Sequence, residues 1–115
     1  MTSLSRSPNR VWKERVVKTG LDLIILRLLM EKPRWGYEIN MEIRDKFEVY
    51  LSAGTLYPLL HLLEERAYVE GVWESEKGRG RRIYRITEQG KEFLLAGQRA
   101  LEDLAQKVRT EGKRT

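Results

Sequence analysis

The densest run of like charge in the sequence lies between Lys77 and Arg85. This segment holds five basic residues and no acidic residue, and glycines occupy positions 78 and 80. Lysine and arginine at this density are suited to neutralising phosphate groups, and glycine lets a backbone approach a ligand closely. A solvated loop is the alternative for any charged run, so the surrounding elements must decide. The basic residues are Lys77, Arg79, Arg81, Arg82 and Arg85.

The other residue types restrict the chemistry available to the chain. There is no cysteine, which excludes disulfides, thiolate nucleophiles and cysteine-based metal sites. His61 is the only histidine, so a histidine cluster is excluded as well. The carboxylates of the expected helix faces have no histidine or nucleophile in a catalytic pattern with them. We therefore expect no enzyme activity, no metal and no cofactor.

The net charge of +5 is unevenly distributed over the 115 residues. Residues 77–85 carry +5, residues 1–20 carry +4 and residues 107–115 carry +3, so the remainder carries −7. Basic segments on an acidic body indicate an acidic partner such as nucleic acid. The main apolar run, Leu21 to Met30, is shorter than the roughly 20 residues that span a bilayer. We expect a single cytoplasmic domain with no membrane partner.

Two helices are expected in the first part of the chain. Eight of the ten residues from Leu21 to Met30 are apolar, which predicts a helix from about Gly20 to Glu31 that is covered on most sides. An extension back through Trp12 is open, although Gly20 weakens that join. Pro33 ends this helix. Apolar residues four apart then predict a second helix from Gly36 to Phe47.

A third helix is predicted from Ser52 to about Arg66, with its leucines facing the core. Two starts are open. If Ser52 is the N-cap, Pro58 falls past the first turn and interrupts the backbone hydrogen bonds. If Thr55 is the N-cap, the N–H that proline lacks is one that would have no helical partner anyway.

A β-hairpin and a long helix complete the chain. Two runs rich in Val, Ile, Tyr and Trp, Tyr68 to Ser75 and Arg82 to Ile86, predict strands with the basic segment at their turn. Trp73 and Tyr84 are expected as a cross-strand pair or as cover for the core. The last helix, Glu88 to Val108, carries an apolar stripe that finds no partner in so small a domain. We expect this stripe to dimerise through Leu94, Leu101, Leu104 and Val108.

This order predicts a mainly α fold with a small β-hairpin: a winged helix-turn-helix plus a C-terminal dimerisation helix. In that fold the third helix enters the major groove and the hairpin, or wing, contacts the DNA backbone. The third helix has no lysine or arginine before Arg66, so hydroxyl and small residues are its expected contacts. The candidate DNA-binding residues are Ser52, Gly54, Thr55, Tyr57 and His61 on the helix, and Lys77, Arg79, Arg81 and Arg82 on the wing.

Four ordered motifs between Lys18 and Leu104 resemble the PadR-like transcriptional regulators. They are TGLDLIIL at 19–26, WGYEI at 35–39, SAGTLYPLL at 52–60 and RIYRITEQG at 82–90. The resemblance implies a homodimeric repressor that binds a palindromic operator in double-stranded DNA. It also implies that the last helix packs on the partner's first helix, here through Leu21, Ile24 and Ile25. Ala53 departs from the family, in which proline is usual at that position.

The last helix is short, which resembles the short-tailed branch of the family. Some members of that branch bind flat aromatic ligands between subunits, against a tryptophan of the last helix. The last helix has no tryptophan here, so that pocket does not transfer residue by residue, although a small aromatic effector at the dimer interface is compatible with a repressor. The alternative function is a winged-helix module that recognises an acidic protein. The expected division is a disordered tail at 1–9, a DNA-binding domain at 10–87, a dimerisation helix at 88–110 and a basic tail at 111–115.

Overall fold

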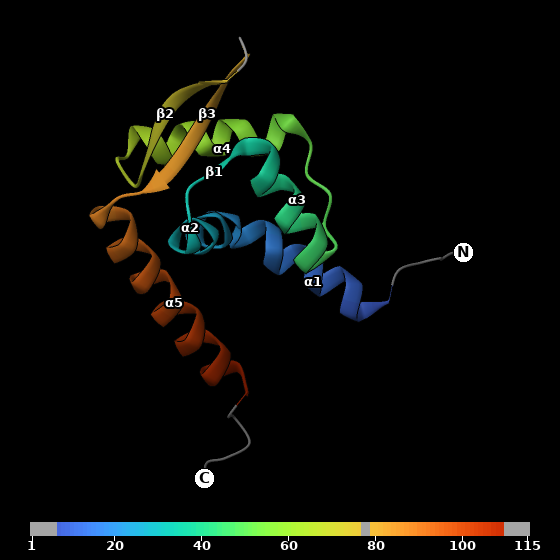
Figure 1. The fold of residues 1–115 in the computed structure, drawn as a ribbon. Helices are drawn as coiled ribbons and strands as arrows, with labels where there is room; N and C mark the ends of the chain where they lie inside the picture. The colour runs from blue at the N-terminus through green and yellow to red at the C-terminus, as the bar shows by residue number, and fades with distance from the viewer. Residues whose placement is uncertain (1–6, 77–78, 110–115) are drawn as a thin grey trace.

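The computed structural model describes residues 7–76 and 79–109, and in this part of the chain helices surround one side of a small antiparallel sheet (Figure 1). The fold class is therefore the predicted one, mainly α with a winged helix-turn-helix order. The elements are α1 (Pro8–Thr19), α2 (Leu21–Glu31), β1 (Arg34–Trp35), α3 (Gly36–Phe47), α4 (Ala53–Glu65), β2 (Val69–Glu76), β3 (Arg79–Ile86) and α5 (Glu88–Arg109).

The N-terminal region contains two helices where one was predicted. Gly20 ends α1 and precedes α2, so the continuous extension through Trp12 is wrong. The Ser7 hydroxyl accepts a hydrogen bond from the Arg10 N–H at 3.2 Å, and Pro8 at the first helical position needs no partner for an N–H. Residues 8 and 9 thus belong to α1, which corrects the tail predicted at 1–9. The rest of that tail, 1–6, and the basic tail at 111–115 lie outside the described residues.

The helix-turn-helix consists of α3, a short connection and α4. The second helix has the predicted bounds, Gly36–Phe47, and Glu48 ends it in the left-handed conformation at φ 57°. The two open starts of the third helix are resolved in favour of Ser52, whose carbonyl accepts the N–H of Thr55 at 3.0 Å. Pro58 therefore lies inside α4, where it leaves one backbone carbonyl without a helical donor.

The wing is a hairpin, as predicted, but its strands are longer than expected: Glu76 ends β2 and residues 79–81 begin β3, although all of them were expected in the turn. Strand β1 extends the hairpin to a sheet of order β1-β3-β2. A two-residue strand has no periodicity of its own, so the sequence did not predict β1. The register sets Trp73 opposite Arg82, and it sets Gly71 opposite Tyr84. The expected Trp73–Tyr84 cross-strand pair is therefore wrong, whereas the alternative, a residue that covers the core, is confirmed for Tyr84, which is buried, and not for Trp73, which is 67% exposed.

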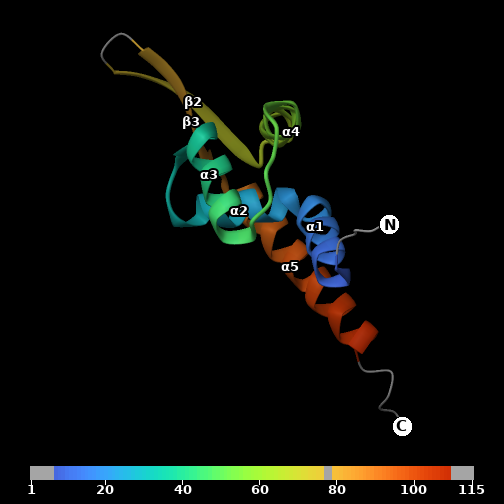
Figure 2. The same cartoon turned by 90° about the vertical axis from the view of Figure 1, so that its right-hand side faces the viewer.

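The core lies between α2, α3, α4 and the sheet, and α5 joins it through α2. Gly97 allows this close approach, because a Cβ there would lie 2.3 Å from the Leu23 side chain. The Thr87 hydroxyl accepts the Gly90 N–H at 3.0 Å and starts α5. The wing and the far end of α5 project from opposite ends of the molecule (Figure 2). The fully buried side chains are Ile25, Leu26, Ile39, Ile43, Leu56 and Leu60.

Candidate nucleic-acid interface

The exposed start of α4 consists of small and hydroxyl-bearing residues. Leu56, Leu60 and Leu63 are buried, so the helix turns its other side to solvent, as the spacing of the leucines predicted. The Ser52 and Thr55 hydroxyl oxygens lie 3.2 Å apart at the start of the helix. All five candidate contacts at this helix are exposed: Ser52, Gly54, Thr55, Tyr57 and His61.

Tyr57 is fixed in place by the helix that precedes it. A Cβ on Gly36 would lie 2.6 Å from Cε1 of Tyr57, so the tyrosine ring rests directly on the first residue of α3. Its side chain is nevertheless 46% exposed. Glycine at 36 is therefore required for the position of Tyr57, which the WGYEI motif alone did not reveal.

His61 lies one turn after Tyr57 and close to a carboxylate. Its Nε2 is 3.3 Å from Oε2 of Glu65, and both side chains are largely exposed. Among the described residues no group of three histidine, cysteine or acidic side chains could hold a metal ion. His61 is thus a surface residue of the helix.

Two of the wing's candidate arginines point to opposite faces of the sheet, because they are neighbours in β3. Arg81 lies 3.7 Å from Glu74 and its guanidinium is 4.6 Å from the centre of the Trp35 ring. Arg82 forms an ion pair with Glu64 at the end of α4 and lies 5.7 Å from the centre of the Trp73 ring. The sequence placed both arginines on the wing, but it did not identify these partners.

Three further basic residues belong to the segment 77–85: Lys77, Arg79 and Arg85. Lys77 lies outside the described residues, and Arg79 begins β3 with its backbone alone described. Arg85 is exposed on the same face of the strand as Arg81. The wing and α4 lie at the same end of the molecule, at the top of Figure 1, so the two groups of candidate contacts are brought together.

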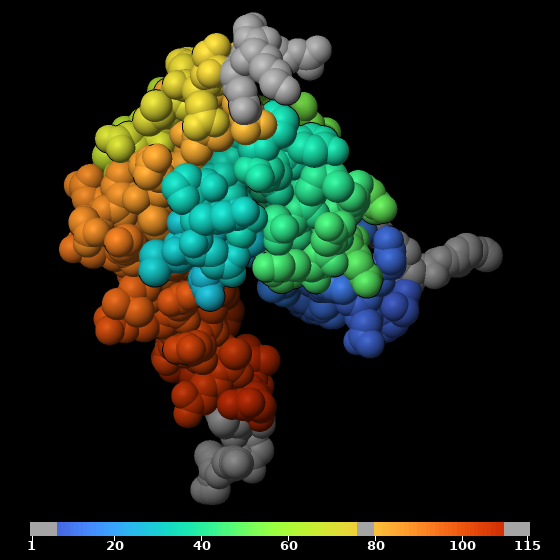
Figure 3. Space-filling view, viewed as in Figure 1, coloured from blue at the N-terminus to red at the C-terminus, as the bar shows by residue number. Residues whose placement is uncertain are grey.

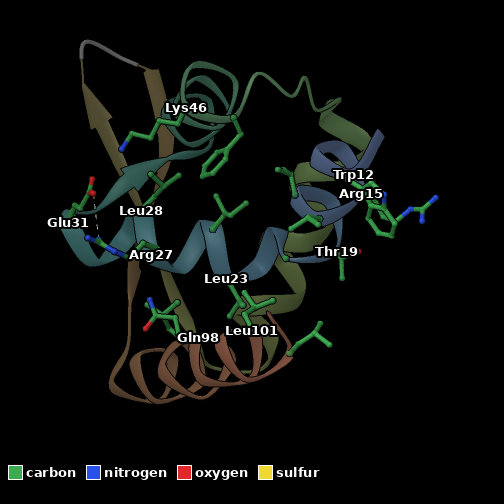
Figure 4. A pocket seen from close by; sticks show the side chains of 17 residues that line it. Trp12, Arg15, Thr19, Leu23, Arg27, Leu28, Glu31, Lys46, Gln98 and Leu101 are labelled. Carbon is green, nitrogen blue, oxygen red and sulfur yellow. Dashed lines mark ion pairs between the residues drawn. The ribbon is translucent and has the colours of Figure 1, made fainter. Parts of the chain in front are cut away.

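The opposite end of the molecule carries an apolar groove of about 620 Å³ between α1, α2 and α5. Figure 3 shows the hollow between the blue α1 and the red α5, and Figure 4 shows Leu23 and Leu101 directed into it. Trp12 lines the groove from α1, with Arg15 at 4.8 Å from the centre of its ring. The ion pair of Arg27 and Glu31, at 3.5 Å, borders it.

The predicted dimerisation residues divide into three groups by their burial. Leu21, Ile25 and Leu94 are buried in the core of their own chain, and of these three only Leu94 lines the groove. Ile24 is partly buried and lines the groove. The other three are increasingly exposed along α5, at 45%, 59% and 72%: Leu101, Leu104 and Val108.

Within residues 7–76 and 79–109, no helix is both long and apolar enough to cross a membrane. A sequence model of the transcriptional regulator PadR-like family matches residues 25–96, which includes the whole helix-turn-helix and the wing. The transcriptional regulator Rv3488 of Mycobacterium tuberculosis is 38% identical over 81 residues, which are 70% of this chain and 64% of that protein.

Solved structures give the same result. A transcriptional regulator from Clostridium thermocellum superposes with a TM-score of 0.75 at 31% identity, over 87% of this chain and 99% of that one. A PadR family transcription regulator from hypervirulent Clostridium difficile R20291 superposes with a TM-score of 0.72 at 26% identity, over 79% of this chain and 96% of that one.

Proposed function

The chain belongs to the PadR-like family of transcriptional regulators, and on that premise we propose that it is a homodimeric repressor of a palindromic operator. As a member of this family it is a DNA-binding regulator and not an enzyme. The observation that carries the proposal is the exposed polar start of α4 beside the wing. A surface of hydroxyl groups next to a basic hairpin suits base contacts from the helix and phosphate contacts from the wing.

In this proposal the start of α4 enters the major groove. Thr55 and Tyr57 contact base edges or phosphates through their hydroxyl groups, and Gly54 lets the helix approach closely. Ser52 and His61 flank them on the same exposed face. The wing neutralises phosphates through its basic segment, including Lys77 and Arg79.

The dimer is proposed from the uncovered half of α5. Its exposed leucines continue the groove, and a second copy of the chain bears the same apolar surface, as a two-fold interface requires. Two recognition helices related by that axis would read half-sites about one helical turn apart. Repression then follows from occupation of the operator.

A small aromatic effector is proposed for the same groove. Its lining is mostly apolar, and Trp12 offers an aromatic ring from α1 in place of a tryptophan on α5. An effector bound there would change the relative orientation of the two subunits, and this would change the spacing between their recognition helices. Quenching of tryptophan fluorescence by planar aromatic compounds, lost in Trp12→Leu, tests this assignment.

The proposed function is tested by binding to duplex DNA selected from a random pool. Gel-shift titrations at rising salt should give a log–log slope of several units, because each neutralised phosphate contributes about 0.9. The selected sequences should be inverted repeats, and light scattering should give twice the chain mass. Absence of binding to every duplex at low salt, together with capture by an acidic protein, would instead support the winged-helix protein-interaction module.

A further inference from the structure

Arg81 and Arg82 share an arrangement that their sequence position does not explain. Each guanidinium lies near one carboxylate and over one tryptophan ring, on opposite faces of β3. Free phosphate-binding arginines on a wing tip need neither partner. The pairs also join separate elements, because the partner groups lie on α4, β1 and β2.

The contact between the wing and α4 depends on Arg82. Its Nη2 donates a hydrogen bond to Oε2 of Glu64, and both side chains are less than one third exposed. The side chain of Arg82 crosses Gly71, where an added Cβ would lie 2.5 Å from Nε of Arg82. The bond to Glu64 raises the pKa of Arg82 above its ordinary value. The guanidinium is thus held between β2 and the end of the recognition helix.

On the other face, Arg81 connects the wing to the start of α3. Its guanidinium packs over Trp35, the last residue before that helix, and lies near Glu74 of β2. The Trp35 N–H donates to the Glu38 carboxylate at 3.1 Å, which fixes the residue at the helix start. The wing is therefore attached to both helices of the helix-turn-helix.

We propose that Arg81 and Arg82 are positioning residues, and that the Glu64–Arg82 ion pair sets the distance between the wing and the recognition helix. This inference rests on the proposed function, and it assigns the phosphate contacts of the wing to its other basic residues. A fixed distance matters because wing and helix must reach a phosphate and a base edge at once.

Glu64→Gln separates this role from a phosphate contact. If Arg82 bound phosphate, removal of the neighbouring negative charge would leave DNA affinity unchanged or raise it. If the ion pair positions the wing, Glu64→Gln lowers affinity for the selected operator by about tenfold. The salt slope stays unchanged, because no phosphate contact is lost. Glu92→Gln is the control: it removes one carboxylate from an exposed position of α5, outside the wing and α4, and we expect operator affinity within about twofold of wild type.

Exchanging the two charges distinguishes loss of the ion pair from misfolding of a single variant. Glu64→Arg or Arg82→Glu alone should weaken operator binding, and the double variant should recover most of it. If Arg82 instead contacts a phosphate, the double variant should bind the operator as weakly as Arg82→Glu, because the contacting cation is missing in both. Thermal melting monitored by circular dichroism establishes that each variant is folded, and a double variant that does not exceed Arg82→Glu would overturn the proposal.

The spacing itself can be measured without DNA. Since the chain has no cysteine, Ser75→Cys on β2 and Glu65→Cys on α4 introduce two unique sites for spin labels. Dilution with unlabelled protein removes distances between subunits. Double electron–electron resonance should give one narrow distance distribution that broadens in Glu64→Gln. An identical distribution would overturn the inference even if operator binding is confirmed, and a chain that binds no DNA would still leave this measurement decisive.

Discussion

Helices α4 and α5 are both amphipathic, but α4 buries more of its apolar face within its own chain. Leu56, Leu60 and Leu63 of α4 lie in the core, whereas α5 buries Leu94 and then exposes its stripe progressively. Every residue from 99 to 109 is exposed. The surface left open by α4 therefore carries hydroxyl groups, His61 and Glu65, with Leu62 as its exposed leucine, whereas the surface left open by α5 has an apolar stripe.

This difference identifies the kind of partner that each end requires. Hydroxyl groups and cations beside a rigid helix suit a hydrated, charged partner such as DNA. Exposed leucines around a groove suit a protein surface that removes them from water. In the proposed dimer, DNA binding and dimerisation therefore use opposite ends of the molecule, and substitutions at the two ends should have different consequences.

The largest effect is expected from Leu101→Glu combined with Leu104→Glu. A dimer that buries both leucines on both subunits loses about 2 kcal/mol per side chain, which raises the dimer dissociation constant at least a thousandfold. Light scattering should give a monomer, and operator affinity should fall with it because the half-sites are no longer bound together. The far-ultraviolet circular dichroism spectrum should change little, because each chain keeps its own core.

Leu95→Glu is the matched control for this prediction. Leu95 is also exposed on α5, but it does not line the groove. We expect the dimer to persist in this variant. If Leu95→Glu dissociates the dimer and the Leu101 and Leu104 changes do not, the interface lies on another face of α5.

The second prediction concerns the covered face of α4. Leu60 has no exposed surface, so Leu60→Ala should lower the free energy of unfolding by about 2–5 kcal/mol. Chemical denaturation measures the change. Because Leu60 does not line the groove, the folded variant should remain a dimer by light scattering. A monomeric but stable Leu60→Ala would contradict the separation of the two ends.

Sequence patterns were sufficient for elements that carry a clear periodicity. The bounds of α3 follow from Ile39, Ile43 and Phe47, and the polar face of α4 follows from its leucines. The break at Gly20 was less visible, because Val17 and Leu21 continue one apolar stripe across it. Periodicity reports which residues are apolar on a face and does not report where the backbone turns.

Partners distant in sequence were not predictable. The Glu64–Arg82 pair joins residues 18 positions apart, and it depends on how the hairpin packs against α4. The same limit explains why two of the predicted dimer residues are buried. Leu21 and Leu94 are apolar, as interface residues are, but α2 and α5 cover them within one chain. Spacing alone does not distinguish a face covered by its own chain from one that a second chain covers.

A smaller effect is expected at Gly36, which does not need to touch DNA to influence binding. Gly36→Ala places a methyl group in the space of the Tyr57 ring and should displace it from its position on α3. Operator affinity should fall by about tenfold, and affinity for unrelated duplexes should fall less. Fluorescence anisotropy with both kinds of duplex measures the ratio.

Tyr57→Phe is the comparison variant, since it keeps the ring and removes only the hydroxyl. Loss of one hydrogen bond should weaken operator binding by about 1 kcal/mol. If Gly36→Ala binds as wild type while Tyr57→Phe does not, the ring position is unimportant and the hydroxyl alone contributes.

The smallest effect is expected from Tyr84 at alkaline pH. Burial raises the pKa of Tyr84 above its ordinary value, although Arg82 nearby acts in the opposite direction. The folded state therefore holds this proton more tightly than the unfolded state, so the stability it contributes is complete below the ordinary tyrosine pKa of about 10 and is lost as pH rises above it. Tyr84→Phe should reduce the loss of stability between neutral and alkaline pH in chemical denaturation. Because Tyr84 belongs to the α4 end, the same alkaline loss should persist in the Leu101 and Leu104 double variant, and its disappearance there would show that the two ends are coupled.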